Sequence, residues 1–357
     1  MAGRSVGAFI FVAVLAFAVA AAEPSPTALM DSGHFKRAWT LAEERLRKNP
    51  EDAEAIYTQA RYKETAGDLD AALPLAEKAC QLDPKNGSYR YLLAGIYGQQ
   101  AERANVFSKW GLAKRFREGA EAAIQLDPKN VDARMGLIEF HLQAPGIVGG
   151  DKDRARALAD EILKIDPARG YLAMALIARR EKRDGEIEGF YLKAVQADPR
   201  SYPALMAIAG FYSGDAQKKY DLSEKYAREA LKLDGDRIGA YAVLAGLFAL
   251  QGRWQDLDSI LAQAEKNVPD NFSPYYNAAR ILLVNGKDLP RSERYFRKYL
   301  SQEPEPNAPT HGHAHWRLGL VYEKMGRKQE AVAELETALR LKPDLEDAKK
   351  DLKRLKG

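Results

Sequence analysis

Apolar residues recur at intervals of three and four along most of the chain, a spacing that is typical of amphipathic α-helices. The helical stretches come in pairs, and a glycine often stands at the short turn within a pair. The pairs end at Pro50, Pro84, Pro128, Pro167, Pro199, Gly235, Pro269, Pro304 and Pro343. These ends are separated by 34, 44, 39, 32, 36, 34, 35 and 39 residues, which predicts a unit of about 34 residues with some insertions.

The unit that ends at Pro84 shows how small residues are placed within each pair. Ala60 lies midway along its first helix (helix A), and Gly67 lies at the turn. Ala72 and Ala79 lie on its second helix (helix B), which stops at a Leu-Asp-Pro triplet. Small side chains let neighbouring helices approach closely, so the sequence predicts stacked helix pairs.

The last unit carries the fullest set of these positions. They are Leu318, Gly319, Tyr322, Gly326, Ala331, Ala338 and Pro343. Residues spaced in this way resemble the signature of the tetratricopeptide-repeat family. The resemblance implies an all-α fold, an α-α superhelix of about eight to nine helix-turn-helix repeats whose A helices line a concave groove. Residues 23–343 would form the solenoid, and the polar segment 344–357 would form the C-terminal capping helix that repeat arrays need.

The beginning of the chain has the order of a secretory signal peptide at residues 1–22. Arg4 precedes an apolar run at 6–17, and a series of small residues follows. Cleavage is predicted after Ala20 or Ala22, which would give an exported protein, soluble once the signal is removed and most simply periplasmic. An uncleaved membrane anchor is the alternative, because the apolar stretch is just long enough to span a bilayer. A eukaryotic secretory compartment also stays open.

Composition and charge argue against several classes of function. The chain has 54 Lys and Arg against 50 Asp and Glu, and its basic runs are short and mixed with acids. Nucleic acid is therefore not an expected partner, because binding it requires a clustered basic face. We find no nucleophile elbow and no isolated carboxylate pair, so we expect neither an enzyme nor a cofactor. Cys80, the only cysteine, is predicted to be a small core residue.

Three units are longer than the others, and such insertions often carry a repeat protein's own features. The unit ending at Pro128 has extra residues around 99–112, and the unit ending at Pro167 has the insertion Ala-Pro-Gly-Ile-Val-Gly-Gly-Asp-Lys at 144–152. The last unit has extra residues at 304–311. The first two insertions together are similar to those of an exported bacterial subgroup of tetratricopeptide-repeat proteins. This resemblance implies an exported repeat protein and no particular reaction.

Two local patterns leave a ligand site open. The glycines at 146–150 could form a nest of backbone amides for an anion. A phosphate loop needs a preceding strand and a Lys-Ser or Lys-Thr ending, which are missing, so we favour a tight turn in which Asp151 caps the next helix. His311, His313 and His315 could hold zinc or copper if their segment were extended. A helix start there would turn them to different faces, so no metal is predicted.

The residues before and after the small residue of each helix A should point into the concave groove. The residues predicted to bind a partner there are Tyr57, Arg61, Tyr91, Met135, Glu139, Leu172, Met206, Tyr276, Arg280 and Trp316. This floor lacks the Lys and Asn of repeats that clamp a partner's carboxylate terminus. Aromatic residues, Met and Arg instead favour a partner segment with apolar anchors. Alternatively, Tyr57, Tyr91 and Trp316 only cover the core beneath them.

The sequence therefore predicts a non-enzymatic scaffold of the cell envelope that binds a segment of another protein in its concave groove. The alternative is a periplasmic small-molecule-binding repeat protein associated with a transporter. The partner's identity and the oligomeric state are left open by the sequence.

Overall fold

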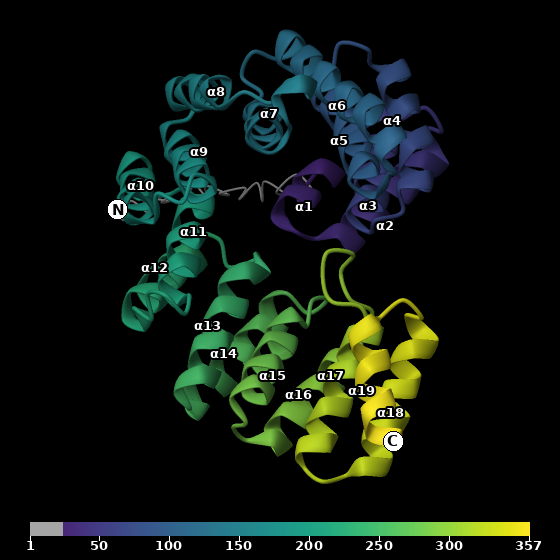
Figure 1. Ribbon diagram of the computed structural model, residues 1–357, viewed down its shortest axis with the longest axis vertical. Coiled ribbons are helices and arrows are strands. Elements are labelled where there is room, and N and C mark those ends of the chain that lie inside the picture. Colours follow the sequence, from purple (N-terminus) through teal and green to yellow (C-terminus); the bar gives the residue numbers. More distant parts are fainter. Residues whose placement is uncertain (1–23) are drawn as a thin grey trace, which may run out of the picture.

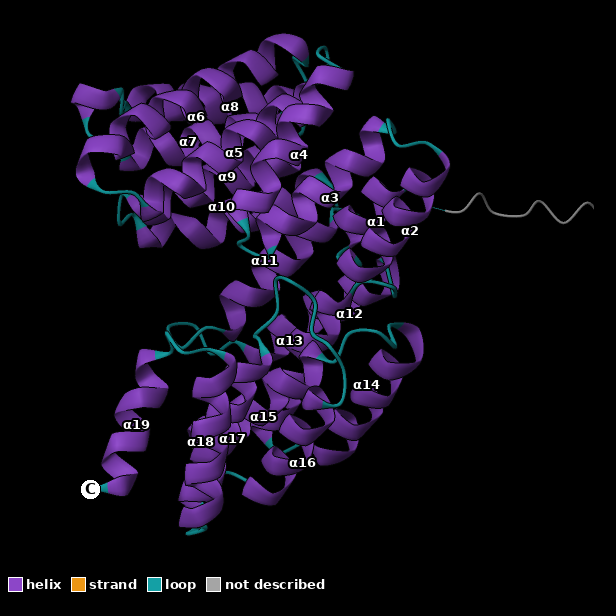
Figure 2. Cartoon of the chain, turned by 90° about the vertical axis from the view of Figure 1, so that its right-hand side faces the viewer, coloured by secondary structure: helices purple, strands orange, loops and turns teal. Residues whose placement is uncertain are grey.

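The computed structural model describes residues 24–357, which fold into nineteen α-helices and one short 3-10 helix, with no strand in that range (Figures 1 and 2). The helices of the N-terminal half are α1 (Pro26–Ser32), α2 (Phe35–Lys48), α3 (Ala53–Thr65), α4 (Leu69–Leu82), α5 (Gly87–Arg103), α6 (Val106–Leu126), α7 (Val131–Gln143), η1 (Gly146–Val148), α8 (Lys152–Ile165) and α9 (Pro167–Arg180). Those that follow are α10 (Asp184–Ala197), α11 (Tyr202–Ser213), α12 (Tyr220–Leu233), α13 (Ile238–Gln251), α14 (Trp254–Asn267), α15 (Ser273–Asn285), α16 (Leu289–Leu300), α17 (His311–Lys324), α18 (Lys328–Leu341) and α19 (Glu346–Lys356).

Consecutive helices pack as pairs, from α1 with α2 to α17 with α18, and each pair packs on the next. Helix α19 closes the array by packing on α18. The predicted all-α superhelix of helical repeats is thus confirmed. The signal peptide predicted at 1–22 lies outside the described residues. None of the helices between residues 24 and 357 has the length and apolar character needed to cross a bilayer.

The Leu-Asp-Pro stops act through their aspartate. Asp83 follows α4 with φ −134°, and its carboxylate accepts a hydrogen bond from the amide of Lys85 at 3.3 Å. Asp127 and Asp198 accept the same bond from the amide two residues further on. Such turns compete with the helix for the backbone and end it. The side chain of Asn86 then caps α5, so one short segment both ends a helix and begins the next.

The turns within the pairs contain a left-handed residue, except the turn between α5 and α6. Gly67 has φ +77° and Gly326 has φ +76°, a conformation that costs a residue with a side chain about 1–2 kcal/mol. Lys182 takes the corresponding place after α9 with φ +58°. The amides of both Gly67 and Lys182 bond to carbonyls of the helix just before them. The turn after α9 is therefore formed without glycine, and the backbone of Lys182 is strained.

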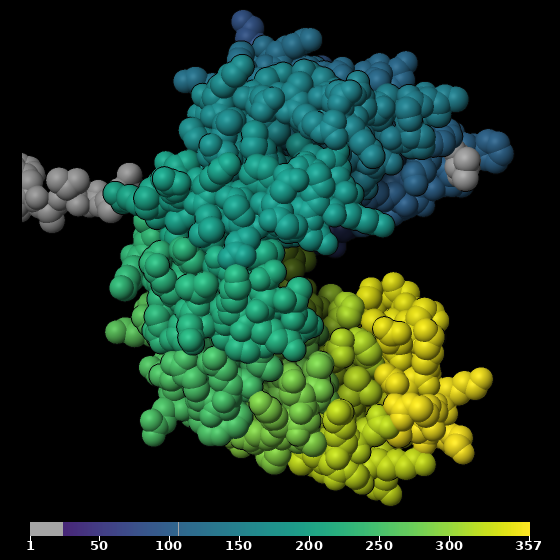
Figure 3. Space-filling model, turned by 60° about the vertical axis from the view of Figure 1, so that its left-hand side comes forward, coloured from purple at the N-terminus to yellow at the C-terminus, as the bar shows by residue number. Residues whose placement is uncertain are grey.

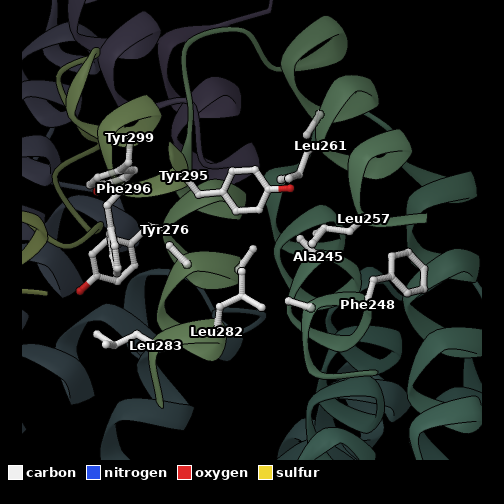
Figure 4. Packing of buried hydrophobic residues seen from close by; sticks show 14 of the residues in the cluster. Ala245, Phe248, Leu257, Leu261, Tyr276, Leu282, Leu283, Tyr295, Phe296 and Tyr299 are labelled. Atoms are coloured by element: carbon white, nitrogen blue, oxygen red, sulfur yellow. The ribbon is translucent and has the colours of Figure 1, made fainter. Parts of the chain in front are cut away.

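Small residues set the distance between neighbouring helices. Ala60, Ala72 and Ala79 are all completely buried. A side chain at Gly319 would bring its Cβ to 3.1 Å from the carbonyl oxygen of Ala331 on the next helix. The largest apolar cluster joins α13 to α17, where aromatic and aliphatic side chains interdigitate (Figure 4). Stability thus comes from contacts between neighbours along the array.

The superhelix curves far enough for its beginning to meet its later repeats. Figure 1 shows the helix pairs following one another around an almost complete turn, so that α2 lies beside the loop between α16 and α17. In Figure 3 a notch separates the yellow C-terminal helices from the N-terminal repeats, so the turn does not close into a flat ring. From α3 to α10, the odd-numbered helices lie on the inside of the turn and the even-numbered ones lie outside (Figure 1).

Charged groups hold this contact together, and we call it the closure contact. The guanidinium of Arg37 donates two hydrogen bonds to the carboxylate of Asp270, at 2.8 and 2.9 Å. The ammonium of Lys36 donates to the backbone carbonyls of Asp270 and Glu303. The backbone amide of Lys36 donates to Glu305 at 3.0 Å. Because these groups come from segments more than 230 residues apart, the contact constrains the curvature of the array between α2 and the loop after α16.

We predict that Lys182→Gly stabilises the protein by about 0.5–1 kcal/mol, because glycine relieves the left-handed strain at the turn after α9. Urea denaturation of the two proteins measures the difference. Lys182→Ala is the matched control, since it also removes the charge but keeps Cβ, and it should bring no such gain. Equal stabilisation by Ala and Gly would show that backbone strain is not the cause.

We also predict that the closure contact weakens as the pH rises. Glu305 is 2% exposed, and burial raises its pKa from 4.5 to about 7, with Lys36, Arg37 and Asp270 as the charged groups around it. A carboxyl whose pKa is higher in the folded state stabilises the fold at low pH and loses that contribution as the pH rises through 7. Between pH 5.5 and 8 the loss should be on the order of 2 kcal/mol.

Urea denaturation at these two pH values tests this prediction, with Glu305→Gln as the control. Glutamine keeps the shape of the side chain but does not titrate. The change in the free energy of unfolding between the two pH values should therefore be smaller in the variant, by the amount predicted for Glu305. A variant with the same pH dependence as the wild type would contradict the assignment to Glu305.

Candidate functional site

The first two insertions enlarge the third and fourth helix pairs. Helix α5 has 17 residues and α6 has 21, against 13 or 14 in α3, α4, α7 and α8. Asn105 begins α6 by accepting hydrogen bonds from the amides of Phe107 and Ser108. The glycine-rich insertion forms η1, after which Asp151 caps α8 by accepting from the amides of two residues that follow it. The predicted tight turn is confirmed, and η1 lies beside α6.

A pocket of about 700 Å³, the apolar pocket, lies between these enlarged pairs. Trp110 and Phe116 of α6, Phe140 of α7 and Val148 of η1 form apolar parts of its wall. Phe116 fits because Gly98 faces it, where an added Cβ would lie 3.1 Å from the ring. Polar groups, among them Gln99, Glu102 and Lys109, also line it. The pocket can therefore take an apolar group and keep polar contacts around it.

A second pocket, the polar pocket, has about 910 Å³ and lies along the A helices α3, α5 and α7. Tyr57, Arg61 and Glu64 of α3 line it, together with Tyr89 of α5 and Asp132 of α7. The rings of Tyr57 and Tyr89 stack with their centroids 4.6 Å apart. The guanidinium of Arg61 lies over the Tyr57 ring at 5.6 Å. This pocket thus has rigid aromatic walls and a charged interior.

The two pockets adjoin, because Tyr91 and Gly95 of α5 line both of them. Tyr91 reaches its place because the facing residue of α7 is Gly136, where an added Cβ would lie 2.4 Å from the Tyr91 hydroxyl. Burial raises the pKa of Tyr91 to about 12, so the hydroxyl is protonated at neutral pH. A Cβ at Gly95 would meet nothing within 4 Å, so this glycine leaves open space where the pockets join.

Most charges of the polar pocket are paired. Arg61 bonds to Asp31 at 2.8 Å, Arg45 bonds to Glu54 at 2.7 Å, and Arg169 pairs with Asp132. Glu64 has no such pair. Its carboxylate accepts a hydrogen bond from Gln99, and no Lys, Arg or His lies within salt-bridge distance of it among residues 24–357. Burial raises the pKa of Glu64, and the positive charge of Arg61, three positions earlier on α3, offsets part of this rise.

The structure brings five of the predicted groove residues together. Tyr57, Arg61, Tyr91, Met135 and Glu139 line one or both of the adjoining pockets. The other five, Leu172, Met206, Tyr276, Arg280 and Trp316, line neither of them.

Two of those five pack against neighbours in the C-terminal half, where Tyr276 is buried and Trp316 is partly buried. Tyr276 is 9% exposed, and its ring packs against Phe296 and Tyr299 with centroids 5.5 and 5.0 Å away (Figure 4). The indole nitrogen of Trp316 donates to Asp351 of α19 at 2.8 Å, and the ring packs against apolar residues of the same helix. Each of these rings therefore has neighbours within the chain that cover it.

The three histidines near α17 contact three different partners. His311 Nε2 lies 2.9 Å from the carbonyl oxygen of Gln302, and His313 Nδ1 lies 2.9 Å from the hydroxyl of Thr310. His315 Nδ1 lies 2.5 Å from the carboxylate of Glu334. Within the described part of the chain, no three His, Cys, Asp or Glu side chains gather as they would around a metal ion.

His141 is packed among neighbouring groups, and Cys80, predicted to be a core residue, lies partly buried at the edge of the core. His141 is 8% exposed, and its Nδ1 lies 2.9 Å from the carbonyl oxygen of Gly149. Burial lowers its pKa, so the ring is mostly neutral at pH 7. Cys80 is half-buried beside the apolar cluster of α3 to α5, and burial raises the pKa of its thiol. Neither residue lines either pocket.

A helical-repeat solenoid with pockets on its concave side is the class of protein that this geometry defines. Two family profiles, both described as tetratricopeptide repeat, match the chain, one at residues 27–87 and 113–170 and the other at 312–345. The chain therefore contains tetratricopeptide repeats, which in general mediate contacts between proteins. Among curated proteins, none matches this sequence.

Several solved structures resemble the fold. Yeast Tom70 has 16% identity and a TM-score of 0.49, over 93% of this chain and 80% of that one. A thermophilic tetratricopeptide-repeat protein of Thermus thermophilus has 21% identity and a TM-score of 0.44, over 58% and 95%. PilF of Pseudomonas aeruginosa has 17% identity and a TM-score of 0.41, over 67% and 99%.

Reasoning from the sequence missed several pocket residues. Glu64 is three positions after Arg61 on α3, so helical spacing could have placed both on one face. Tyr89 and Phe140 gave no such signal, because each is one apolar position among many on its helix. That they line a pocket follows only from how α5, α6 and α7 pack together.

Proposed function

We propose that this protein is a non-enzymatic interaction scaffold of the cell envelope, and that it binds a segment of a partner protein on its concave side. The adjoining apolar and polar pockets support this most directly, since they join at Tyr91 and Gly95 on the inner helices. An extended or helical segment laid across α3, α5 and α7 would enter both pockets. Such a binding mode suits repeat proteins, whose curvature exposes a long concave surface.

The lining also fits the energetics of a protein interface. Tyrosine and tryptophan supply large contact areas at a low entropic cost, and such residues dominate binding energy. Tyr57, Tyr91 and Trp110 are residues of this kind. The closure contact holds the curvature of the array, so the pockets need little rearrangement on binding, which preserves affinity.

The envelope location rests on the order of residues 1–22, which has the basic, apolar and small-residue segments of a secretory signal. We therefore propose that the protein is located in the periplasm. Detection of the protein in a periplasmic extract, with an N-terminus at residue 21 or 23, would support it.

A second candidate function is the binding of a small apolar molecule, and the apolar pocket is the feature that favours it. Its volume of about 700 Å³ lies in the range of small-molecule sites. Native mass spectrometry of the purified protein should then show a bound molecule that Gly95→Trp loses. A wild-type spectrum without added mass would count against this candidate and leave the scaffold proposal standing.

We predict that Gly95→Trp abolishes partner binding without harming the fold. The indole would fill the space where the two pockets join, and a Cβ at this position meets no other atom. Tryptophan also has a higher helix propensity than glycine, by roughly a few tenths of a kcal/mol. A photo-crosslinker at Met135, which lines the polar pocket, should capture a partner in native cells from the wild type and not from the variant.

Gly210→Trp is the matched control. Gly210 lies inside α11, where a Cβ likewise meets no atom within 4 Å, and it lines neither pocket. This variant should crosslink the same partner as the wild type. If Gly95→Trp keeps the full crosslinking yield, the concave pockets are not the binding site.

A further inference from the structure

Carboxylates outnumber cationic groups around the two pockets. The acidic residues that line them are Asp31, Glu54, Glu64, Glu102, Asp132 and Glu139. Only Arg61 and Lys109 oppose them within the same walls. The chain as a whole has a formal net charge of +4, so this part of the surface has the opposite sign to the molecule. The potential in the pockets therefore favours a positively charged group.

Neighbouring arginines offset part of this charge, and among residues 24–357 only Glu64 and the more exposed Glu102 of these six carboxylates are left without a salt bridge. Arg45, Arg169 and Arg180 lie outside the pocket walls and pair with Glu54, Asp132 and Glu139, respectively. Glu64 accepts a hydrogen bond from the uncharged amide of Gln99, and Arg61 of the same helix acts on it without forming a salt bridge. A carboxylate that is partly removed from water and has no salt-bridge partner gains from a cation brought by a ligand.

Gln99 also connects the two pockets. Glu64 lines the polar pocket and Gln99 lines the apolar pocket, so the hydrogen bond between them lies at their junction. A cation that reaches Glu64 would therefore lie next to whatever fills the apolar pocket. One short segment can supply both groups.

Tyrosines of the polar pocket also favour a cation, and Tyr91 is the one whose surroundings include Glu64. Tyr89 and Tyr91 line the polar pocket, and neither hydroxyl is hydrogen-bonded to another group among residues 24–357. Each hydroxyl can accept a hydrogen bond from an ammonium or guanidinium group. The faces of tyrosine rings also attract such cations.

We propose that the bound segment presents a lysine or arginine side chain to Glu64 in the polar pocket, beside an aromatic or aliphatic side chain that enters the apolar pocket. This inference rests on the proposed function, because it assumes that the concave side binds a partner segment. It adds the chemistry of the partner, a basic residue close to an apolar anchor. It also assigns the preference for a basic side chain to Glu64 and the preference for an apolar side chain to the lining of the apolar pocket.

Selection from a random-peptide phage library tests this assignment, with immobilised full-length protein as the bait. The wild type should enrich peptides in which Lys or Arg stands near an aromatic or aliphatic residue. Glu64→Gln keeps the hydrogen bond to Gln99 possible but removes the charge, so it should lose the preference for Lys and Arg and keep the apolar preference. Val148→Asp places a charge in the apolar pocket, so it should lose the apolar preference and keep the preference for Lys and Arg.

The outcomes separate this inference from the proposed function. Enrichment of apolar peptides without Lys or Arg, or of acidic peptides, would overturn the inference and leave the scaffold proposal intact. A preference for basic residues that persists in Glu64→Gln would also overturn it. If Gly95→Trp enriches the same peptides as the wild type, the pockets do not bind segments and the proposed function itself fails.

A double-mutant cycle then measures the contact directly. For one enriched peptide, fluorescence anisotropy should show about tenfold weaker binding when its basic residue is replaced by norleucine, as for a lost hydrogen bond to a charged group. In Glu64→Gln the same replacement should change the affinity by less than about twofold. Equal losses in both proteins would show that the basic residue does not contact Glu64. Circular dichroism of Glu64→Gln checks that the helices are retained.

Discussion

Successive helices of this chain approach one another closely because alanine or glycine stands where they cross. A single helix pair cannot bury its own apolar face, so it depends on the pairs before and after it. Ala60, Ala72 and Ala79 are completely buried for this reason. The same close approach fixes the angle between neighbouring pairs, and that angle accumulates along the array into the curvature seen in Figure 1. The concave side and its pockets are consequences of this stacking.

The pockets arise where the regular stacking is changed. Helices α5 and α6 are longer than their neighbours, and η1 is added beside α6. Phe116 stands in the middle of the lengthened α6, and Gly98 makes room for it. Gly95 and Gly136 then remove side chains from the inner surface. The resulting space has apolar walls at one end and carboxylates at the other, which is why it suits a segment of mixed character.

The closure contact adds a long-range constraint to a fold that is otherwise built from neighbour contacts. Arg37 and Lys36 meet Asp270 and the loop around Glu305, so a change in curvature would break several charged hydrogen bonds at once. Arrays without such a contact can flex along their length. Here the inner surface is held near one shape, which lowers the cost of ordering it around a partner.

The sequence by itself determined the helices, their ends and their pairing. These depend on residues close together in the chain, such as Asp83 at a stop or Gly67 at a turn, or one unit apart. It also indicated Tyr57 and Tyr91 as residues of the inner face. Only the tertiary structure decided that Glu64 has no salt bridge, that Trp316 packs against α19, and that α2 meets a loop from far along the chain. The first two depend on how side chains of neighbouring units pack together. The third depends on the summed rotation of many repeats, which no local pattern specifies.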